Sequence, residues 1–235
     1  MKSARARGTI LAVCGLRAES RIAAGPGVCA IAGGDGVAML RHALQTRFAE
    51  VCGIMSFGIA GSLDERLPAG TTVVARTVIA HNQRWETDQA WSAAVAKCVP
   101  ASTQGDIAAR DRPVMTIAEK RELRSNTSAL AVDTESHIAA EAAAVLGIPL
   151  AVFRVIADAA DLALPKAAVI ALRSDGTINV GAVLQSVGRS PGQMLLLLRT
   201  AHATAIALRT LARGRKRLGI RLGFPDLSEL VLDVP

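Results

Sequence analysis

The chain has 235 residues, of which 51% are hydrophobic and 3% aromatic. A chain of this length and composition can bury a substantial core, so we predict a single α/β domain and exclude intrinsic disorder. No fully apolar run approaches the roughly 18 residues that a membrane span needs. The basic segment 1–8 precedes only a short apolar run and does not resemble a secretory signal, which favours a cytoplasmic protein.

The 27 Lys and Arg residues outnumber the 20 Asp and Glu residues, which gives a net charge of +7. A basic balance suggests nucleic acid or an anionic membrane as a partner. The excess lies between Gly176 and Pro225, where eight basic residues occur without an acid. Because the chain has few aromatic side chains and no Tyr, it offers few stacking platforms, and we expect no nucleic-acid partner.

Residues Thr9 to Cys14 are predicted to form a first strand, and a helix begins after Gly15. Backbone N–H groups at such a turn favour anions, and Arg17 adds a cation, so Gly15 and Arg17 are one candidate phosphate site. Glu19 instead suggests activation of water. An exposed, charged first turn of a helix is an equally good interpretation.

Glycine and small residues follow the next two predicted strands, which are Val28 to Ala32 and Val51 to Met55. The glycine cluster 33–36 lacks the spacing of a dinucleotide fingerprint and is predicted as a turn before a helix over 37–48. The small residues within 56–61, such as Gly58 and Gly61, let the backbone approach a ligand, although such residues also simply turn a chain.

His81 is interpreted as a surface histidine, because no second histidine or acid stands at metal spacing in the sequence. The cysteines also lack metal spacing, so we expect reduced cysteines, no disulfide and no metal; they are Cys14, Cys29, Cys52 and Cys98. The other elements expected before residue 129 are strands at 71–74, 78–80 and 113–116, a surface loop with a short helix at 81–91, and a helix at 117–125.

The stretch from 129 to 161 organises the prediction. An apolar strand leads to Glu135, a helix runs from His137 to Leu146, and a buried strand from Leu150 to Ile156 leads to Asp158. Ligands of open α/β sheets bind at the carboxyl ends of the strands, so Glu135 and Asp158 can converge on one small molecule. Two such acids suit glycosyl chemistry, but solvated loop carboxylates are an equally good alternative.

The C-terminal part is predicted to contain helices at 166–173 and 191–213, and a basic tail at 214–235 that is loosely ordered from Ile220. Its long helix has one apolar face for packing on the sheet. If the helix continues past Gly214, its outer arginines at 199, 213 and 217 fall near one another and suit an anionic lipid surface, although a solvated face is the simpler interpretation. The main domain then spans 9–213.

Four motifs in this order resemble the purine nucleoside phosphorylase and methylthioadenosine/adenosylhomocysteine nucleosidase superfamily over residues 9–165. They are Gly15 with Glu19, residues 57–63 leading to 68–71, residues 132–136, and residues 154–161. The altered region 105–120 and the basic, leucine-rich C-terminal end resemble the hopanoid-biosynthesis-associated phosphorylase branch. The expected reaction of that branch removes adenine from adenosylhopane.

The resemblance implies a central mixed, twisted, partly closed sheet flanked by helices, and a homodimer or higher homo-oligomer. It implies a nucleoside substrate, which in this branch is lipid-linked, at the inner membrane face. No cofactor is implied, and phosphate is an optional co-substrate.

The resemblance also assigns roles. Asp158 matches the general acid on purine N7, Glu135 the carboxylate that binds the ribose hydroxyls, and Glu19 the group that activates water. Acid and base on opposite faces suit an oxocarbenium-like transition state. The other residues expected at the substrate are Thr134, Gly58, Ile59, Ala60, Thr116 and Ile117.

Several positions depart from the family pattern. Ser56 and Ile59 stand where phosphorolytic relatives carry an Arg and a phosphate-binding Ser, which favours hydrolysis. Thr134 replaces a Met, and Ala157 replaces a Ser that would orient the acid. A phosphate-dependent phosphorylase and a purine-binding scaffold without turnover are the alternatives.

Overall fold

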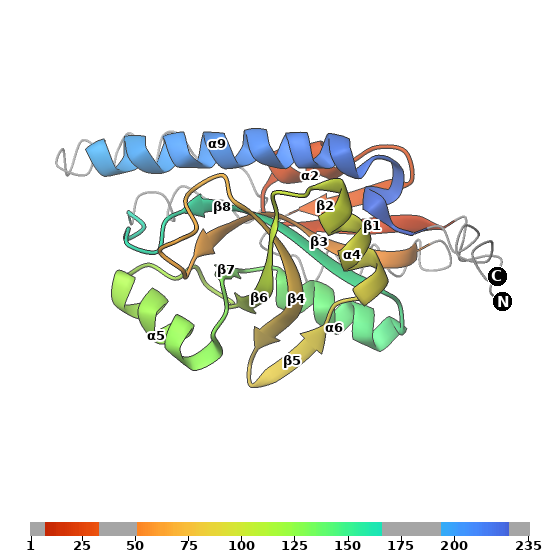
Figure 1. Ribbon diagram of the computed structural model, residues 1–235, viewed down its shortest axis with the longest axis horizontal. Coiled ribbons are helices and arrows are strands. Elements are labelled where there is room, and N and C mark those ends of the chain that lie inside the picture. Colours follow the sequence, from red (N-terminus) through yellow and green to blue (C-terminus); the bar gives the residue numbers. More distant parts are fainter. Residues whose placement is uncertain (1–7, 33–50, 166–193, 226–235) are drawn as a thin grey trace.

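The computed structural model of the chain describes residues 8–32, 51–165 and 194–225 (Figure 1). The predicted turn at 33–36 and the predicted helices at 37–48 and 166–173 lie outside the described residues. The same holds for residues 1–7 and 226–235, which belong to the two predicted basic tails.

A mixed sheet forms the centre of the molecule. Strands pair in the order β2-β1-β3-β7-β6-β4-β5, and β8 pairs with both β3 and β4. Strands β3, β7, β6, β4 and β8 therefore close into a ring, which confirms the predicted mixed, partly closed sheet. The eight strands of the described part are β1 (Thr9–Cys14), β2 (Val28–Ala32), β3 (Val51–Ser62), β4 (Thr72–Ala80), β5 (Gln83–Glu86), β6 (Thr103–Ala109), β7 (Ala131–Asp133) and β8 (Leu150–Asp158).

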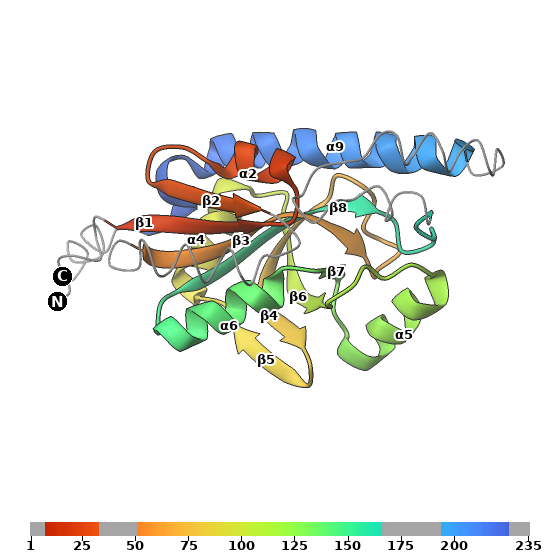
Figure 2. The same cartoon turned by 180° about the vertical axis from the view of Figure 1, so that it is seen from behind.

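Helices cover both faces of the sheet. Helices α9 and α2 lie together on one side, and α6 lies on the other (Figures 1 and 2). Successive side chains of a strand point to opposite faces, so β3 serves two cores: Phe57 packs in a cluster with Leu211 of α9, and Ile54 in a cluster with Ala140 of α6. The described helices are α2 (Arg17–Ala23), α4 (Gln89–Cys98), α5 (Ile117–Thr127), α6 (Ser136–Leu146), α9 (Met194–Leu218) and the 3-10 helix η3 (Ile220–Gly223).

Strand β3 is longer than predicted. It continues through residues 56–61, which include Gly58 and Gly61, to Ser62 instead of ending at Met55. Glycine disfavours a strand locally, but β3 lies between β1 and β8 and pairs with β8 from Ile54 to Gly61. Pairing on both sides outweighs local propensity, so the expected turn is a central strand.

Two further predictions were wrong. Residues 113–116 form no strand and lead into α5, whereas 81–91, expected as a loop and short helix, contains β5 and the start of α4. Strand β6 was missed. Both missed strands carry polar residues at their starts, so neither shows an apolar alternation that a sequence pattern could detect.

The C-terminal segment packs more closely than predicted. Helix α9 passes Arg213 and runs to Leu218. It packs closely on β8 at Gly214, where an added Cβ would come within 2.6 Å of the Phe153 ring. Beyond it, Leu222 is fully buried and its carbonyl accepts a hydrogen bond of 3.0 Å from the Trp91 indole N–H. The expectation of loose order from Ile220 is therefore wrong for residues 220–224.

This contact predicts a large difference between two neighbouring substitutions. Leu222→Ala removes a fully buried side chain and should lower the free energy of unfolding by about 2–5 kcal/mol. Ile220→Ala, at a position 72% exposed, should change it by less than about 0.5 kcal/mol. Urea unfolding of the two variants measures both values, and equal effects would contradict the packing of this segment.

Candidate active site

A buried arginine joins the acids at the carboxyl ends of the strands. Arg154 of β8 is 0% exposed. Its Nε lies 2.7 Å from Oδ2 of Asp133, and its Nη1 lies 3.1 Å from Oε2 of Glu135. Nη2 donates to the Ser56 hydroxyl over 2.5 Å. A buried guanidinium persists only with such partners, so Arg154 ties β8 to β3 and to the β7–α6 turn.

Asp133 shapes that turn. Its Oδ1 accepts the Ser136 N–H over 3.0 Å, and its Oδ2 accepts the Ser136 hydroxyl. The Ser136 hydroxyl oxygen also lies 2.9 Å from that of Ser56 on β3. The carboxylate of Asp133 thus satisfies the first turn of α6 and holds the preceding residue, Glu135, at the edge of the sheet.

Glu19 is buried at the turn between β1 and α2. It is 1% exposed and accepts backbone N–H groups from Gly15 at 2.9 Å, Leu16 at 2.8 Å and Ile59 at 2.7 Å. Burial raises the pKa of Glu19 from 4.5 to about 7, while the nearby Arg154 guanidinium opposes that rise. The group therefore changes charge near neutral pH.

Two glycines let the carboxyl groups lie directly on the backbone. A Cβ at Gly15 would come within 2.6 Å of Oε1 of Glu135, and a Cβ at Gly58 within 2.7 Å of Cδ of Glu19. Larger residues at either position would displace an acid. Gly15 and Gly58 thus bring Glu19 and Glu135 to the same end of the sheet, where their charges influence each other.

Asp158 ends β8 and is paired with a buried lysine. Lys120 of α5 is 1% exposed, and its ammonium group contacts Oδ2 of Asp158. The same ammonium donates to the carbonyls of Ala159 at 2.7 Å and Leu162 at 2.9 Å. Burial raises the pKa of Asp158, while the positive charge of Lys120 opposes that rise.

A cavity of about 140 Å³ lies between these groups, and both Glu135 and Asp158 line it. Glu19 lies behind its wall and contacts the N–H of the lining residue Ile59. The three predicted acids thus converge. The lining residues are Ile59, Ala60, Gly61, Pro113, Val114, Lys120, Val132, Asp133, Thr134, Glu135, Ala157, Asp158 and Leu164.

Some predicted site residues lie away from the cavity lining. Gly58 lies under Glu19, Gly15 donates its N–H to Glu19, and Arg17 is exposed on α2. Thr116 caps α5 in a reciprocal pair with Glu119. Like Ile117, these four residues are not among those that line the cavity.

Sequence reasoning missed the two buried cations. Arg154 interrupts the apolar run of β8, and a charge inside a buried strand requires acidic partners, so its signal was present. Lys120 is one of several charged residues in α5 and gave no such signal. Asp133 was included in a motif but not given a role.

The fold and the site define an α/β enzyme with a small acidic pocket at the carboxyl ends of its strands. Residues 15–188 match the model of the phosphorylase superfamily, so the chain belongs to that superfamily. The prediction of an enzyme of the nucleosidase or nucleoside phosphorylase class is confirmed at this level. No curated protein matches the sequence.

Solved structures share the fold at low sequence identity. Futalosine hydrolase of Helicobacter pylori superposes with a TM-score of 0.66 at 17% identity, covering 90% of this chain and 97% of its own. A mutant 5′-methylthioadenosine/S-adenosylhomocysteine nucleosidase of the same organism superposes with a TM-score of 0.61 at 17% identity, covering 90% of this chain and 99% of its own. S-adenosylhomocysteine nucleosidase of Streptococcus pyogenes superposes with a TM-score of 0.57 at 18% identity, covering 82% of this chain and 95% of its own. At such identities the likeness shows the fold alone.

The burial of Glu19 predicts a pH-dependent stability. Between pH 4.5 and about 7 the folded chain holds a proton on Glu19 that the unfolded chain has lost. The stabilisation of the folded state by the protonated Glu19 is therefore fully present below pH 4.5. It is lost as the pH rises through about 7, which lowers the free energy of unfolding by about 3 kcal/mol. Glu19→Gln, which stays neutral, should remove this part of the decline in the free energy of unfolding.

The measurement is urea unfolding at several pH values. Glu141→Gln, at an exposed position on α6, is the matched control and should keep the wild-type pH dependence. An identical pH dependence in the wild type and Glu19→Gln would contradict a raised pKa at Glu19.

Proposed function

We propose that the chain hydrolyses the N-glycosidic bond of a 5′-substituted adenosine and releases adenine. The observation that carries this proposal is that Glu135 and Asp158 line one cavity while Glu19 lies behind its wall at Ile59. One related fold, a nucleosidase carrying an aspartate-to-asparagine change, holds 5′-methylthioadenosine in its active site.

Asp158 is the proposed acid on the leaving purine. A departing adenine carries negative charge, and a proton delivered to N7 lowers the barrier by an amount worth ~10²- to 10⁴-fold in rate. Burial raises the pKa of Asp158 and so favours its protonated form, while the Lys120 ammonium group opposes that rise. Ala157 lacks the hydroxyl that a Ser at this position would offer to orient the acid. Here the Lys120 ammonium group contacts Oδ2 of Asp158 and fixes the carboxyl group instead.

Glu135 is the proposed ligand of the ribose hydroxyls. Its Oε1 accepts the Thr134 hydroxyl, and its Oε2 pairs with Arg154. Both interactions restrict the carboxylate to one orientation at the cavity wall. A fixed carboxylate near the sugar also stabilises positive charge that develops on the ribosyl group.

Water is the proposed nucleophile, rather than phosphate. A phosphate site at this turn would need free backbone N–H groups, but Gly15, Leu16 and Ile59 donate theirs to Glu19. A second anion beside the Glu19 carboxylate would also be repelled. With a pKa of about 7, Glu19 is matched to general-base catalysis near neutral pH.

Release of adenine from methylthioadenosine, measured with and without phosphate, tests the chemistry. We expect release that does not require phosphate. Asp158→Asn should lower kcat by ~10²- to 10⁴-fold with little loss of substrate binding. The kcat/KM of the wild type should rise with pH up to about 7, and Glu19→Gln should remove that rise.

Other outcomes favour the alternatives. Strict dependence on phosphate would favour a phosphorylase, which would release a phosphoribosyl product. Nucleoside binding without any product, unchanged in Asp158→Asn, would favour a purine-binding scaffold. Absence of both binding and turnover with methylthioadenosine and adenosylhopane would contradict the proposal.

Adenosylhopane is the proposed substrate, and the N-terminal half of α9 is the proposed contact with the inner membrane face. One helix of the described residues, Leu195–Leu218, is long and apolar enough to span a membrane by length and composition. However, Ala207, Leu211 and Leu218 are buried against the body of the protein, which favours a surface position. Leu195 and Leu198 are 62% and 61% exposed, and no acid occurs in α9.

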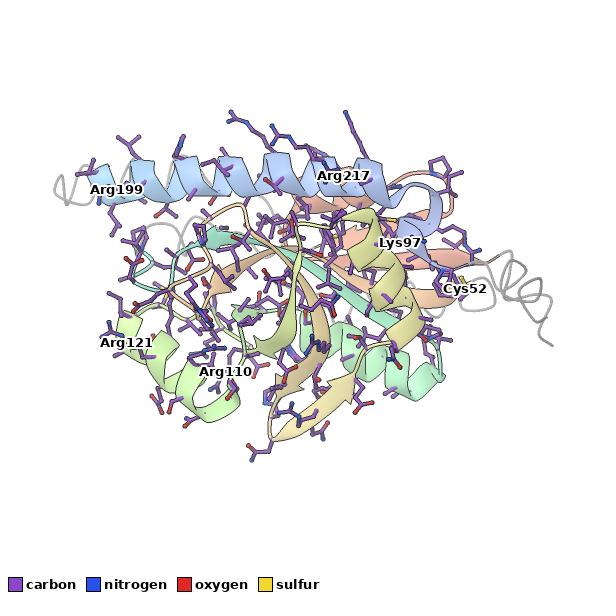
Figure 3. The ribbon with its side chains drawn as sticks, in the orientation of Figure 1. Cys52, Lys97, Arg110, Arg121, Arg199 and Arg217 are labelled. Carbon is purple, nitrogen blue, oxygen red and sulfur yellow. The ribbon has the colours of Figure 1, made fainter. Side chains whose placement is uncertain are left out.

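Arg199 lies apart from Arg213 and Arg217, so these three arginines do not form the single group that the sequence predicted; the other basic residues of α9 lie in its C-terminal half. Arg199 and Arg217 lie near opposite ends of the helix (Figure 3), roughly 27 Å apart along its axis at 1.5 Å per residue. Exposed leucines beside Arg199, with a basic cluster farther along the same helix, suit the surface of an anionic bilayer, into which the apolar side chains insert.

Sedimentation with vesicles tests the membrane contact. We expect the protein to bind anionic vesicles more strongly than neutral ones, and the double change Leu195→Ser with Leu198→Ser to reduce this binding. Val145→Ser, at an 85% exposed position on α6, is the control and should bind like the wild type. Equal binding by all three proteins would contradict a role for α9.

A homo-oligomer remains a prediction, which analytical ultracentrifugation can test.

A further inference from the structure

Two histidines and an aspartate from three separate elements meet near the end of the β4–β5 hairpin. Nε2 of His81 lies 3.4 Å from Oδ1 of Asp111, and Nε2 of His137 lies 3.2 Å from the same oxygen. The two imidazole rings are 5.5 Å apart, with an angle of 72° between their planes. The sequence shows no second histidine or acid at metal spacing from His81, but the fold brings His137 and Asp111 beside this surface histidine.

The backbone holds each of these residues from a different direction. His81 occupies the two-residue turn between β4 and β5, with a φ of 49°. Asp111 follows β6, and the N–H of the preceding residue, Arg110, donates to the Asp133 carbonyl over 2.9 Å. His137 lies in the first turn of α6 and is 6% exposed. The cluster therefore depends on the tertiary fold, as a built site does.

The separations match those between ligands of one metal ion. Ligands at 2.0–2.1 Å from a tetrahedral zinc ion lie roughly 3.3–3.4 Å from one another. The two nitrogen-to-oxygen distances fall close to this value, and one potential ligand atom from each residue lies within 4.8 Å of the others. The His81 side chain is 50% exposed and has room to close the remaining gap.

We propose that His81, Asp111 and His137 form a binding site for one divalent transition-metal ion, with zinc as the best match. Two imidazoles and a carboxylate are ligands that zinc accepts, and water would complete its four positions. The site stands independently of the proposed glycosidic chemistry, because none of the three residues lines the cavity.

A metal at this site would link three segments around the cavity. It would join the β4–β5 hairpin to α6, which begins directly after the lining residue Glu135, and to the segment that leads from Asp111 to the lining residue Pro113. We therefore expect metal binding to raise the thermal stability of the whole chain.

Titration of chelator-treated protein with Zn²⁺, in competition with a chromophoric chelator, tests the site. We expect one tightly bound ion per chain. His81→Gln and Asp111→Asn should each weaken binding at least about 100-fold, because even the loss of an outer partner of a metal ligand costs 10- to 100-fold. Both positions are largely exposed, so the variants should fold. His202→Gln, at an exposed position on α9, is the matched control.

Two further readouts separate this site from adventitious binding. Co²⁺ should give visible absorption bands of a four-coordinate ion without the charge-transfer band of a thiolate, which excludes the four free cysteines. Zn²⁺ should raise the Tm of the wild type and of His202→Gln, but not of Asp111→Asn. Absence of tight binding, or equal binding by Asp111→Asn, would overturn the proposal.

Discussion

The buried guanidinium of Arg154 is the interaction on which the site depends. A charge inside the apolar strand β8 is costly to desolvate, and the carboxylates of Asp133 and Glu135, together with the Ser56 hydroxyl, offset that cost. Asp133 ends the short strand β7 and Glu135 precedes α6, so Arg154 connects β8 with both elements. The same charge also opposes the rise in the pKa of Glu19 that burial produces. Packing and acid–base chemistry therefore depend on one cation.

Two of the acids that line the cavity, Glu135 and Asp158, are held by different cations. Glu135 pairs with a planar guanidinium that also binds Asp133 and Ser56, so its orientation is fixed by several directed contacts. Asp158 pairs with the single ammonium group of Lys120, a compact charge. Burial raises the pKa of Asp158. Differing environments for neighbouring acids are the usual basis for dividing acid and binding roles in one pocket.

The buried carboxylate of Glu19 lowers the stability of the fold when it is charged, and a role in proton transfer would explain why it is there. A carboxylate that is 1% exposed is destabilising when charged, and its three backbone hydrogen bonds offset only part of that cost. A glutamine has only one acceptor oxygen, so it could not accept the bonds that Glu19 receives at both Oε1 and Oε2. Strongly shifted groups of this kind are concentrated at functional sites, which agrees with a role for Glu19 in proton transfer.

Much of the molecule could be predicted from sequence. Apolar runs located β1 and β8, Gly147 marked the end of α6, and motif order led to the superfamily and the three acids. These signals work because neighbours in the chain carry them. The partners of Arg154, the pairing of Lys120 with Asp158, the full length of β3 and the meeting of His81 with His137 depended on the tertiary structure. Each depends on residues far apart in sequence, whose contact is set by strand pairing and burial and leaves no local pattern.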